Sequence, residues 1–393
     1  MKRAKQILAL VCVLALVFSL AACSSSKKSD SGELAPIKLG AILSQTGTNA
    51  HGGQQGLNAM NLLIKQVNEA GGIKGRQIEL LVENTNSEPE QAVNGAMKLT
   101  NEDKVLALLG PDNGSTATAV KEQVAEVDEI VQISITGSSP KLTADGPRWY
   151  FRGATPSTYQ TKGISDYLVN DLGYTRIAIL CDDSLTDQAE SMIKDLASYN
   201  LEPIDEETHK TGNTNFNGQL LSVKEYDPEC IFFIGYPTEC ASALKQARDM
   251  GITARFAGSS GMVYKELVEL AGDLANGIIA SIGFTASNPD EKVQAFVADY
   301  EAAYGETPEH AAGQAYDQLS LVLEAIRQCD LSFDESDLAS DRTMIRDWLE
   351  TKANGYQGLS GVIAYTQEDH TAYKSVNLMT VEDGAWKVLR AAQ

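Results

Sequence analysis

Short apolar runs alternate with stretches of helical periodicity along almost the whole chain. In the first half, the predicted strands are residues 37–43, 77–82, 105–109 and 130–135. The helices predicted between them are residues 54–67, 89–99 and 116–127. A regular strand–helix alternation of this kind predicts a parallel sheet with helices on both faces.

The same alternation begins again after residue 155. The strands predicted there are residues 176–181, 230–234, 255–258 and 278–283, with strand-like runs at 362–365 and 373–379. The helices predicted there are residues 157–172, 186–198, 215–225, 238–250, 291–304, 312–329 and 341–351. We therefore predict an α/β fold with two similar parallel-sheet lobes.

The first residues follow the order of a secretory signal. Basic residues at positions 2, 3 and 5 precede an apolar run at 7–20, which is too short to cross a bilayer as a helix. The run ends in Leu20-Ala21-Ala22-Cys23, which resembles the cleavage box of bacterial lipoproteins. The resemblance implies a signal peptide at 1–22 and a lipid on Cys23. The alternative is an ordinary secretory signal that happens to end beside a cysteine.

Residues 23–36 are rich in serine and lysine and predict a flexible tether. No later segment is long and apolar enough to span a membrane. We therefore expect a protein held at the extracytoplasmic face of the cell membrane by its lipid anchor.

The charge balance limits which classes of molecule the protein is expected to bind. Acidic residues number 53 against 32 basic ones, so the formal net charge is −21. Nucleic-acid binding requires clustered lysine and arginine, and we expect no nucleic-acid partner. Cys181, Cys230, Cys240 and Cys329 have neither zinc-site nor redox spacing, which favours buried free thiols over disulfides.

Catalytic motifs are absent from the sequence. There is no GxxxxGK[ST] phosphate loop and no GxSxG elbow, and no two of the four histidines have metal-ligand spacing. We therefore expect no enzyme activity, no cofactor and no metal site.

Polar, glycine-containing loops follow three of the predicted strands in the first half, at residues 44–52, 110–116 and 136–140. Ligands of parallel sheets bind beyond the carboxyl ends of the strands. Loop glycines and helix-start N–H groups suit a carboxylate, and hydroxyls in the third loop suit a carboxylate or an ammonium group. For Ser115 the alternative is a plain helix cap. Three such loops at one sheet edge favour a binding site.

The order of several short motifs resembles the type I periplasmic binding proteins of the Leu/Ile/Val-binding group. The motifs are Gly71-Gly72-Ile73-Lys74-Gly75-Arg76, Gly110-Pro111, Ser138-Ser139-Pro140, Tyr150-Phe151-Arg152, Gly235-Tyr236, Ala315-Tyr316-Asp317 and Gly358-Leu359-Ser360-Gly361. The resemblance covers residues 37 to about 386. It implies two lobes joined by three chain crossings, lobe one at 37–154 plus 287–352 and lobe two at 155–286 plus 353–393.

The resemblance also implies roles for individual residues. The ligand's α-carboxylate would contact Ser115 and Ser138, with backbone help at Gly114 and Thr136. His51 stands where the group often has an aromatic residue beside the ligand. Tyr236 stands where a tyrosine of lobe two closes over it.

The sequence departs from the group at the ammonium site. The group's acidic residue is replaced by Ser260, which carries no charge. Either another acid takes that role, with Asp183 the first candidate and Asp182 the second, or the ligand lacks a cationic amine. We therefore expect an amino acid, an amide or a related carboxylate as the ligand, bound in a way that differs from a plain branched-chain amino acid.

The function that these features favour is a solute-binding protein that delivers a small ligand to an ABC permease. Two other classes stay open: a ligand-sensing subunit of a signalling receptor, and a secreted α/β hydrolase.

Overall fold

The computed structural model describes residues 34–146 and 148–392. The expected signal peptide, Cys23 and nearly all of the tether lie outside the described residues. Residues 36–393 form one unit, to which the fold and the site below belong. Among the described residues, no helix combines the length and apolar character needed to cross a bilayer.

The first sheet has five parallel strands in the order β2-β1-β3-β4-β5. Its strands are β1 (Ile37–Leu43), β2 (Ile78–Asn84), β3 (Leu108–Leu109), β4 (Gln132–Ser134) and β5 (Tyr150–Arg152). The strand runs are apolar because helices cover both faces of the sheet.

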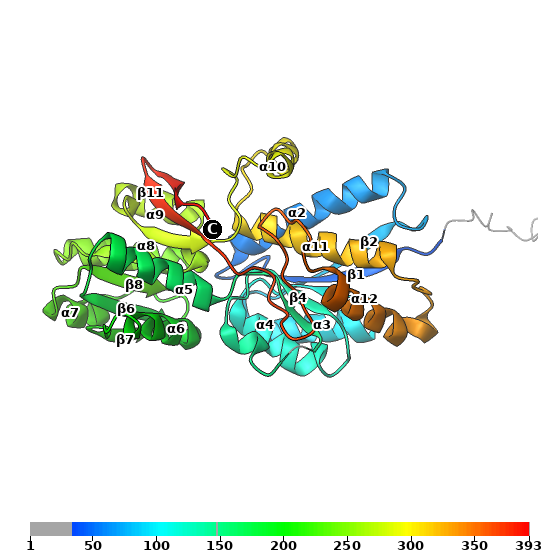
Figure 1. Cartoon of the computed structure of the whole chain (residues 1–393), viewed down its shortest axis with the longest axis horizontal. Helices are drawn as coiled ribbons and strands as arrows, with labels where there is room; N and C mark the ends of the chain where they lie inside the picture. Colours follow the sequence, from blue (N-terminus) through cyan, green and yellow to red (C-terminus); the bar gives the residue numbers. More distant parts are fainter. Residues whose placement is uncertain (1–33, 147, 393) are drawn as a thin grey trace, which may run out of the picture. The chain divides into compact units, whose positions relative to one another are not determined.

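Helices from two distant parts of the chain cover this sheet (Figure 1). One face packs against α2 (Ala50–Glu69), α10 (Glu291–Tyr304), α11 (His310–Gln328) and α12 (Leu338–Lys352). The other face packs against α3 (Pro89–Asn101), α4 (Gly114–Val120) and the π-helical turn Lys121–Ala125 that continues α4. The last helices before residue 353 therefore pack on the first sheet.

The second sheet has seven strands in the order β12-β11-β10-β9-β8-β6-β7. Its strands are β6 (Ile177–Asp182), β7 (Glu206–His209), β8 (Cys230–Ile234), β9 (Arg255–Gly258), β10 (Ile279–Ile282), β11 (Asn377–Glu382) and β12 (Ala385–Arg390). Strands β6 to β10 are parallel, but β11 runs antiparallel to β10 and β12 antiparallel to β11. The two-lobed α/β fold is confirmed, with an antiparallel edge that the sequence did not predict.

Five helices cover the second sheet. One face packs against α7 (Asn217–Glu225), α8 (Pro237–Asp249) and α9 (Lys265–Ala271). The other packs against α5 (Ser157–Asp166), which continues as a π-helical turn, and α6 (Thr186–Ala197). Cys181, Cys230 and Cys240 are buried free thiols, and Cys329 is a partly exposed one, in agreement with the expectation.

Most predicted elements form within a few residues of their expected ends, but one prediction is wrong. Residues 362–365 do not form a strand. Val362 makes a single bridge to Gln357, while Ile363 and Tyr365 are buried in the core of the first sheet. The apolar run that suggested a strand is explained by this packing, because the segment lies against a core without a neighbouring strand to pair with. The sequence also missed β5, β7, β12 and α9.

Within residues 36–393 the chain passes between the two sheets three times. The first passage follows β5, the second follows β10, and the third precedes β11. The lobe limits stay predictions, but the segment after residue 352 departs from them. Leu359, Ile363, Tyr365 and Tyr373 pack in the core of the first sheet, so the third passage comes after Tyr373.

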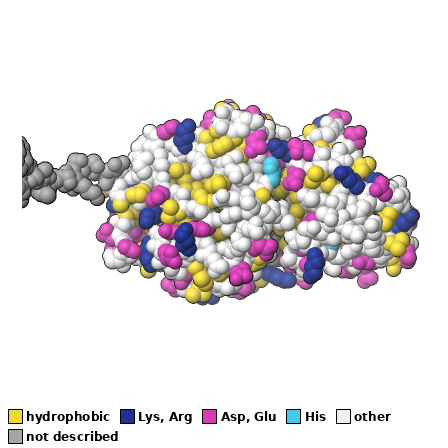
Figure 2. All heavy atoms as spheres, turned by 180° about the vertical axis from the view of Figure 1, so that it is seen from behind, with side chains coloured by type: hydrophobic (Ala, Val, Ile, Leu, Met, Phe, Trp, Pro, Cys, Tyr) yellow, Lys and Arg dark blue, Asp and Glu magenta, His cyan; other side chains and the backbone are white. Residues whose placement is uncertain are grey.

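Charged side chains are dispersed over the face shown in Figure 2, where acidic groups and fewer basic groups alternate with uncharged surface. No continuous basic stripe crosses this face.

Candidate ligand-binding site

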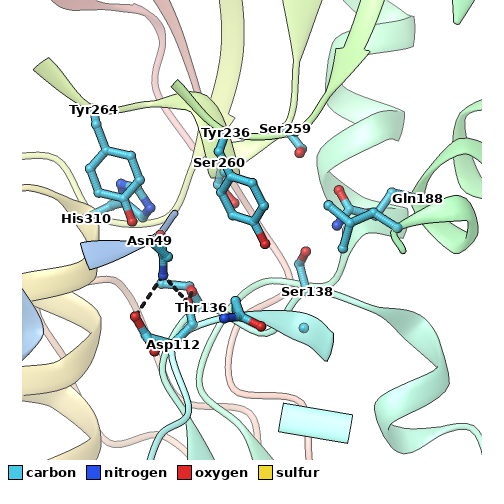
Figure 3. Close-up of a pocket in the computed structure, with 15 residues that line it drawn as sticks. Asn49, Asp112, Thr136, Ser138, Gln188, Tyr236, Ser259, Ser260, Tyr264 and His310 are labelled. Carbon is cyan, nitrogen blue, oxygen red and sulfur yellow. Dashed lines mark hydrogen bonds between the residues drawn. The ribbon is translucent and has the colours of Figure 1, made fainter. Parts of the chain in front are cut away.

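The carboxyl ends of strands from both sheets enclose one cavity (Figure 3). Loops after β3 and β4 supply one wall, and loops after β6, β8 and β9 supply the opposite wall. The fifteen lining residues are Asn49, Asp112, Asn113, Gly114, Thr136, Ser138, Leu185, Gln188, Gly235, Tyr236, Ser259, Ser260, Gly261, Tyr264 and His310. This is the position at which parallel sheets bind ligands.

Asp112 joins three loops of the first sheet. Its carboxylate accepts from the backbone N–H and the hydroxyl of Ser44, each at 3.0 Å, and from the Asn49 amide at 2.8 Å. Its backbone carbonyl accepts from the Asn49 amide at 2.7 Å and the Thr136 hydroxyl at 2.5 Å. Burial raises the pKa of Asp112 to about 6, although these donors lower it. The loops after β1, β3 and β4 are thereby held together.

Gly110 starts the loop that carries Asp112. Its φ is +106°, and a Cβ there would lie 2.2 Å from the backbone oxygen of Ile42. Only glycine fits this conformation and this close approach. The turn directs Asp112 and Asn113 into the space between the sheets.

The start of α4 uses side chains rather than a ligand to satisfy its first N–H groups. The Asn113 side chain accepts from the backbone N–H of Thr116 at 3.0 Å. The Ser115 hydroxyl donates to the same Asn113 oxygen at 3.0 Å. Gly114 lines the cavity but Ser115 does not. Asn113 is therefore the N-cap of α4, and the Ser115 hydroxyl supports that cap by donating to the Asn113 side chain.

The wall from the second sheet is built around Tyr236 and the turn at Ser259–Gly261. The Tyr236 backbone N–H donates to Glu239 at 2.9 Å, which secures the start of α8. The Ser260 backbone N–H donates to Gln160 at 3.0 Å. Burial raises the pKa of Tyr236 above its usual value, so its hydroxyl stays protonated.

Of the residues expected in the site, Gly114, Thr136, Ser138, Tyr236 and Ser260 line the cavity. The hydroxyls of Ser138, Tyr236 and Ser260 have no hydrogen-bond partner among the described residues, so they are free to bind a ligand. The backbone carbonyl of Ser138 accepts a hydrogen bond from the backbone N–H of Ser157 at 2.8 Å, which holds Ser138 in place.

His51 and Asp183 lie outside the cavity lining. The His51 ring hydrogen-bonds Glu309, which raises the pKa of the imidazole, and it meets the Tyr264 ring edge-on at 5.5 Å. Asp183 pairs with Lys210. Neither Asp183 nor its neighbour Asp182 supplies an acid to this cavity; the acid that lines it is Asp112.

Sequence reasoning missed several lining residues. Asp112 and Asn113 lie in the predicted polar loop at residues 110–116, and their polar side chains were the signal that could have identified them as lining residues. No local sequence motif identifies Gln188, Tyr264 or His310 as lining residues. Tyr264 reaches α2 because Gly52 leaves room; a Cβ there would lie 2.5 Å from the Tyr264 hydroxyl. Burial lowers the pKa of His310 to about 4, so this histidine is neutral.

Asp182, His209 and Glu239 form a buried cluster whose possible metal-ligating atoms lie within 4.8 Å of one another. The sequence spacing did not predict this cluster. Its atoms already have protein partners: Asp182 accepts from Ser184 and Thr211, and His209 contacts two backbone carbonyls. Glu239 accepts from the backbone N–H groups of Tyr236 and Gly212. The cluster therefore braces the loops behind Tyr236.

Two α/β lobes with a polar cavity between their strand ends define a class of solute-binding proteins. Residues 36–385 match the Periplasmic binding protein family, and the chain belongs to this family. It is 28% identical over 254 residues to an amino acid binding protein of Pseudomonas aeruginosa, covering 64% of this chain and 68% of that protein.

Two further relatives point to the same group. A leucine-, isoleucine-, valine-, threonine- and alanine-binding protein of Pseudomonas aeruginosa is 25% identical, covering 74% of this chain and 78% of that protein. The structure of a branched-chain amino acid transporter substrate binding protein of Streptococcus pneumoniae, in complex with isoleucine, superposes with a TM-score of 0.78. The two are 28% identical, covering 91% of this chain and all of that one. The chain is thus a solute-binding protein of the branched-chain amino acid group, and these relatives are binding proteins.

Proposed function

We propose that this protein captures a small amino-acid-like solute outside the cytoplasm and delivers it to the permease of an ABC importer. The observation that carries the proposal is the cavity lined by loops at the strand ends of both sheets. A ligand there contacts both lobes at once, so its binding favours the arrangement in which they approach each other.

Contacts across the cavity mouth fit this role. Glu309, next to the first sheet's helix α11, accepts from the backbone N–H of Lys265 in the second lobe at 2.5 Å. Ser139 of the first lobe donates to Asp187 of the second. These contacts are few and polar, and such contacts form and break readily as lobes rotate about a hinge.

The free hydroxyls of Ser138, Tyr236 and Ser260 support binding of a carboxylate. Each can donate one hydrogen bond, and donors directed at an ionised group are stronger than those directed at a neutral one. The cavity contains no lysine or arginine among its lining residues, so neutral donors would hold the carboxylate.

The proposed anchor is the lipidated Cys23. A tethered receptor stays close to its permease and still samples solute, which is the use we infer for the polar stretch after Cys23.

The test is ligand identification followed by calorimetry. A variant that lacks the first 23 residues would be purified and denatured, and the released small molecules identified by mass spectrometry. Titration of the refolded protein with each compound should give saturable one-to-one binding. Absence of binding to any amino acid, amide or simple carboxylic acid would contradict the proposal.

A further inference from the structure

The cavity's charge is set by one carboxylate. Among its lining residues there is no lysine or arginine, and Asp112 is the acidic one. His310 is buried and neutral, because burial lowers its pKa to about 4. Apart from its hydroxyl groups, the lining therefore offers a negative charge that can accept hydrogen bonds and no positive charge that can donate them.

Two buried acceptors of the lining have no partner. The side-chain oxygen of Gln188, a residue 6% exposed, makes no hydrogen bond, and neither does Nδ1 of His310, which is 3% exposed. The pKa of His310 is lowered by burial and raised by a backbone hydrogen bond with Val263, so one ring nitrogen acts as a donor. A neutral imidazole that donates from one nitrogen accepts at the other. Both orphan atoms thus lack a donor.

Aliphatic side chains are few in the lining. Leu185 is the aliphatic side chain of the set, and the two aromatic residues, Tyr236 and Tyr264, carry hydroxyls. An aliphatic ligand side chain would leave both acceptors unsatisfied. Sites whose buried polar groups lose their partners discriminate strongly against the wrong ligand.

We propose that the ligand carries an N–H donor at its side-chain end, as an amide or amine, and that Gln188 or His310 accepts a hydrogen bond from this donor. The inference rests on the proposed function and narrows its substrate class from amino-acid-like solutes to those with a polar, nitrogen-bearing side chain. Figure 3 shows Gln188 and His310 on opposite sides of the cavity, so a ligand between them can reach either residue.

Two pairs of amino acids of similar size test this chemistry. Leucine and asparagine form the shorter pair, and methionine and glutamine the longer one. Calorimetry on the protein without its first 23 residues should show the amide binding at least about tenfold more tightly in one or both pairs, the value of roughly one hydrogen bond. Tighter binding of the apolar member in both pairs would overturn the inference and leave the proposed function standing. Binding of none of the four would contradict both.

Gln188→Leu should abolish the preference for the amide, and Gln188→Glu should keep it, since the carboxylate retains an acceptor. Gln314→Leu is the matched control. Gln314 is also a buried glutamine with an unpartnered side-chain oxygen, on α11, but it does not line the cavity. An unchanged preference in Gln188→Leu, with Gln314→Leu also unchanged, would exclude Gln188 from recognition.

His310→Phe removes the second acceptor at similar ring size. We expect methionine or leucine to gain affinity relative to its amide partner by about tenfold. His310 also borders a second cavity of about 510 Å³, so Gln188, which borders the ligand cavity alone, gives the cleaner test. Thermal unfolding of each variant separates a change in recognition from a failure to fold.

Discussion

Asp112 illustrates how much one side chain does in this cavity. Its carboxylate and its carbonyl receive hydrogen bonds from Ser44 and Asn49 of the loop after β1 and from Thr136 of the loop after β4. The same burial that makes these bonds effective makes the negative charge costly, and this is why the pKa of Asp112 rises to about 6.

The raised pKa of Asp112 predicts how stability changes with pH. Between pH 4 and 6 the folded chain holds a proton on Asp112 that the unfolded chain releases, so this group's contribution to stability falls as pH rises through that window. Asp112→Asn removes the effect. The free energy of unfolding of the variant, relative to the native protein, should therefore improve by roughly 2–3 kcal/mol from pH 4 to pH 7. Urea titrations of both proteins across this range measure it, and a constant difference would contradict it.

Ser138 and Ser115 separate a hydroxyl that lines the cavity from one that bonds the Asn113 cap of α4. Ser138→Ala should weaken binding of a carboxylate ligand by roughly ten- to a hundredfold, since a hydrogen bond to a charged group contributes about 1.5–3 kcal/mol. Ser115→Ala is the control and should leave affinity nearly unchanged, because its hydroxyl bonds Asn113 outside the cavity lining. Calorimetry with the identified ligand measures the affinity of both variants. Equal losses in both variants would restore Ser115 as a binding residue.

At the scale of elements, the start of α4 depends on Asn113. Its side chain accepts from Thr116, and α4 continues directly into a π-helical turn before β4. The cap therefore secures the loop that carries both Asp112 and Gly114 into the cavity.

Asn113→Ala should lower the free energy of unfolding by about 0.5–2 kcal/mol, the usual cost of losing such a cap. Asn170→Ala provides a matched change, because Asn170 is an exposed asparagine that bonds the Asp166 side chain. It should cost under about 0.5 kcal/mol. Denaturant unfolding without ligand measures both. Similar losses for the two variants would mean that the Asn113 cap contributes no more to the free energy of unfolding than an exposed side-chain hydrogen bond.

At the scale of the whole molecule, the chain crosses between the sheets three times and places helices α10–α12 of the later sequence on the first sheet. This arrangement gives each lobe its own core and leaves the cavity between the strand ends as the place where a ligand joins them.

The proposed membrane attachment through Cys23 belongs to the full-length chain. We predict that Cys23→Ala releases the protein from membranes, because the described residues contain no helix able to span a bilayer. Cys329→Ala, which changes a partly exposed thiol far along the chain, should stay attached. Fractionation in high salt followed by immunoblotting measures both. A Cys23→Ala protein that remains in the membrane fraction would contradict lipidation at this position.

The sequence by itself determined the periodicities, and through them most strands and helices. It also determined the three polar loops after β1, β3 and β4, because strand ends and glycine-rich turns are local features. Ser138, Thr136, Gly114 and Tyr236 were found in this way or through the resemblance. Only the tertiary structure decided that the Ser115 hydroxyl bonds the Asn113 cap and that residues 359–373 pack on the first sheet. It alone brought Gln188, Tyr264 and His310 to the cavity, because three helices remote in sequence meet there, and no local pattern encodes such a meeting.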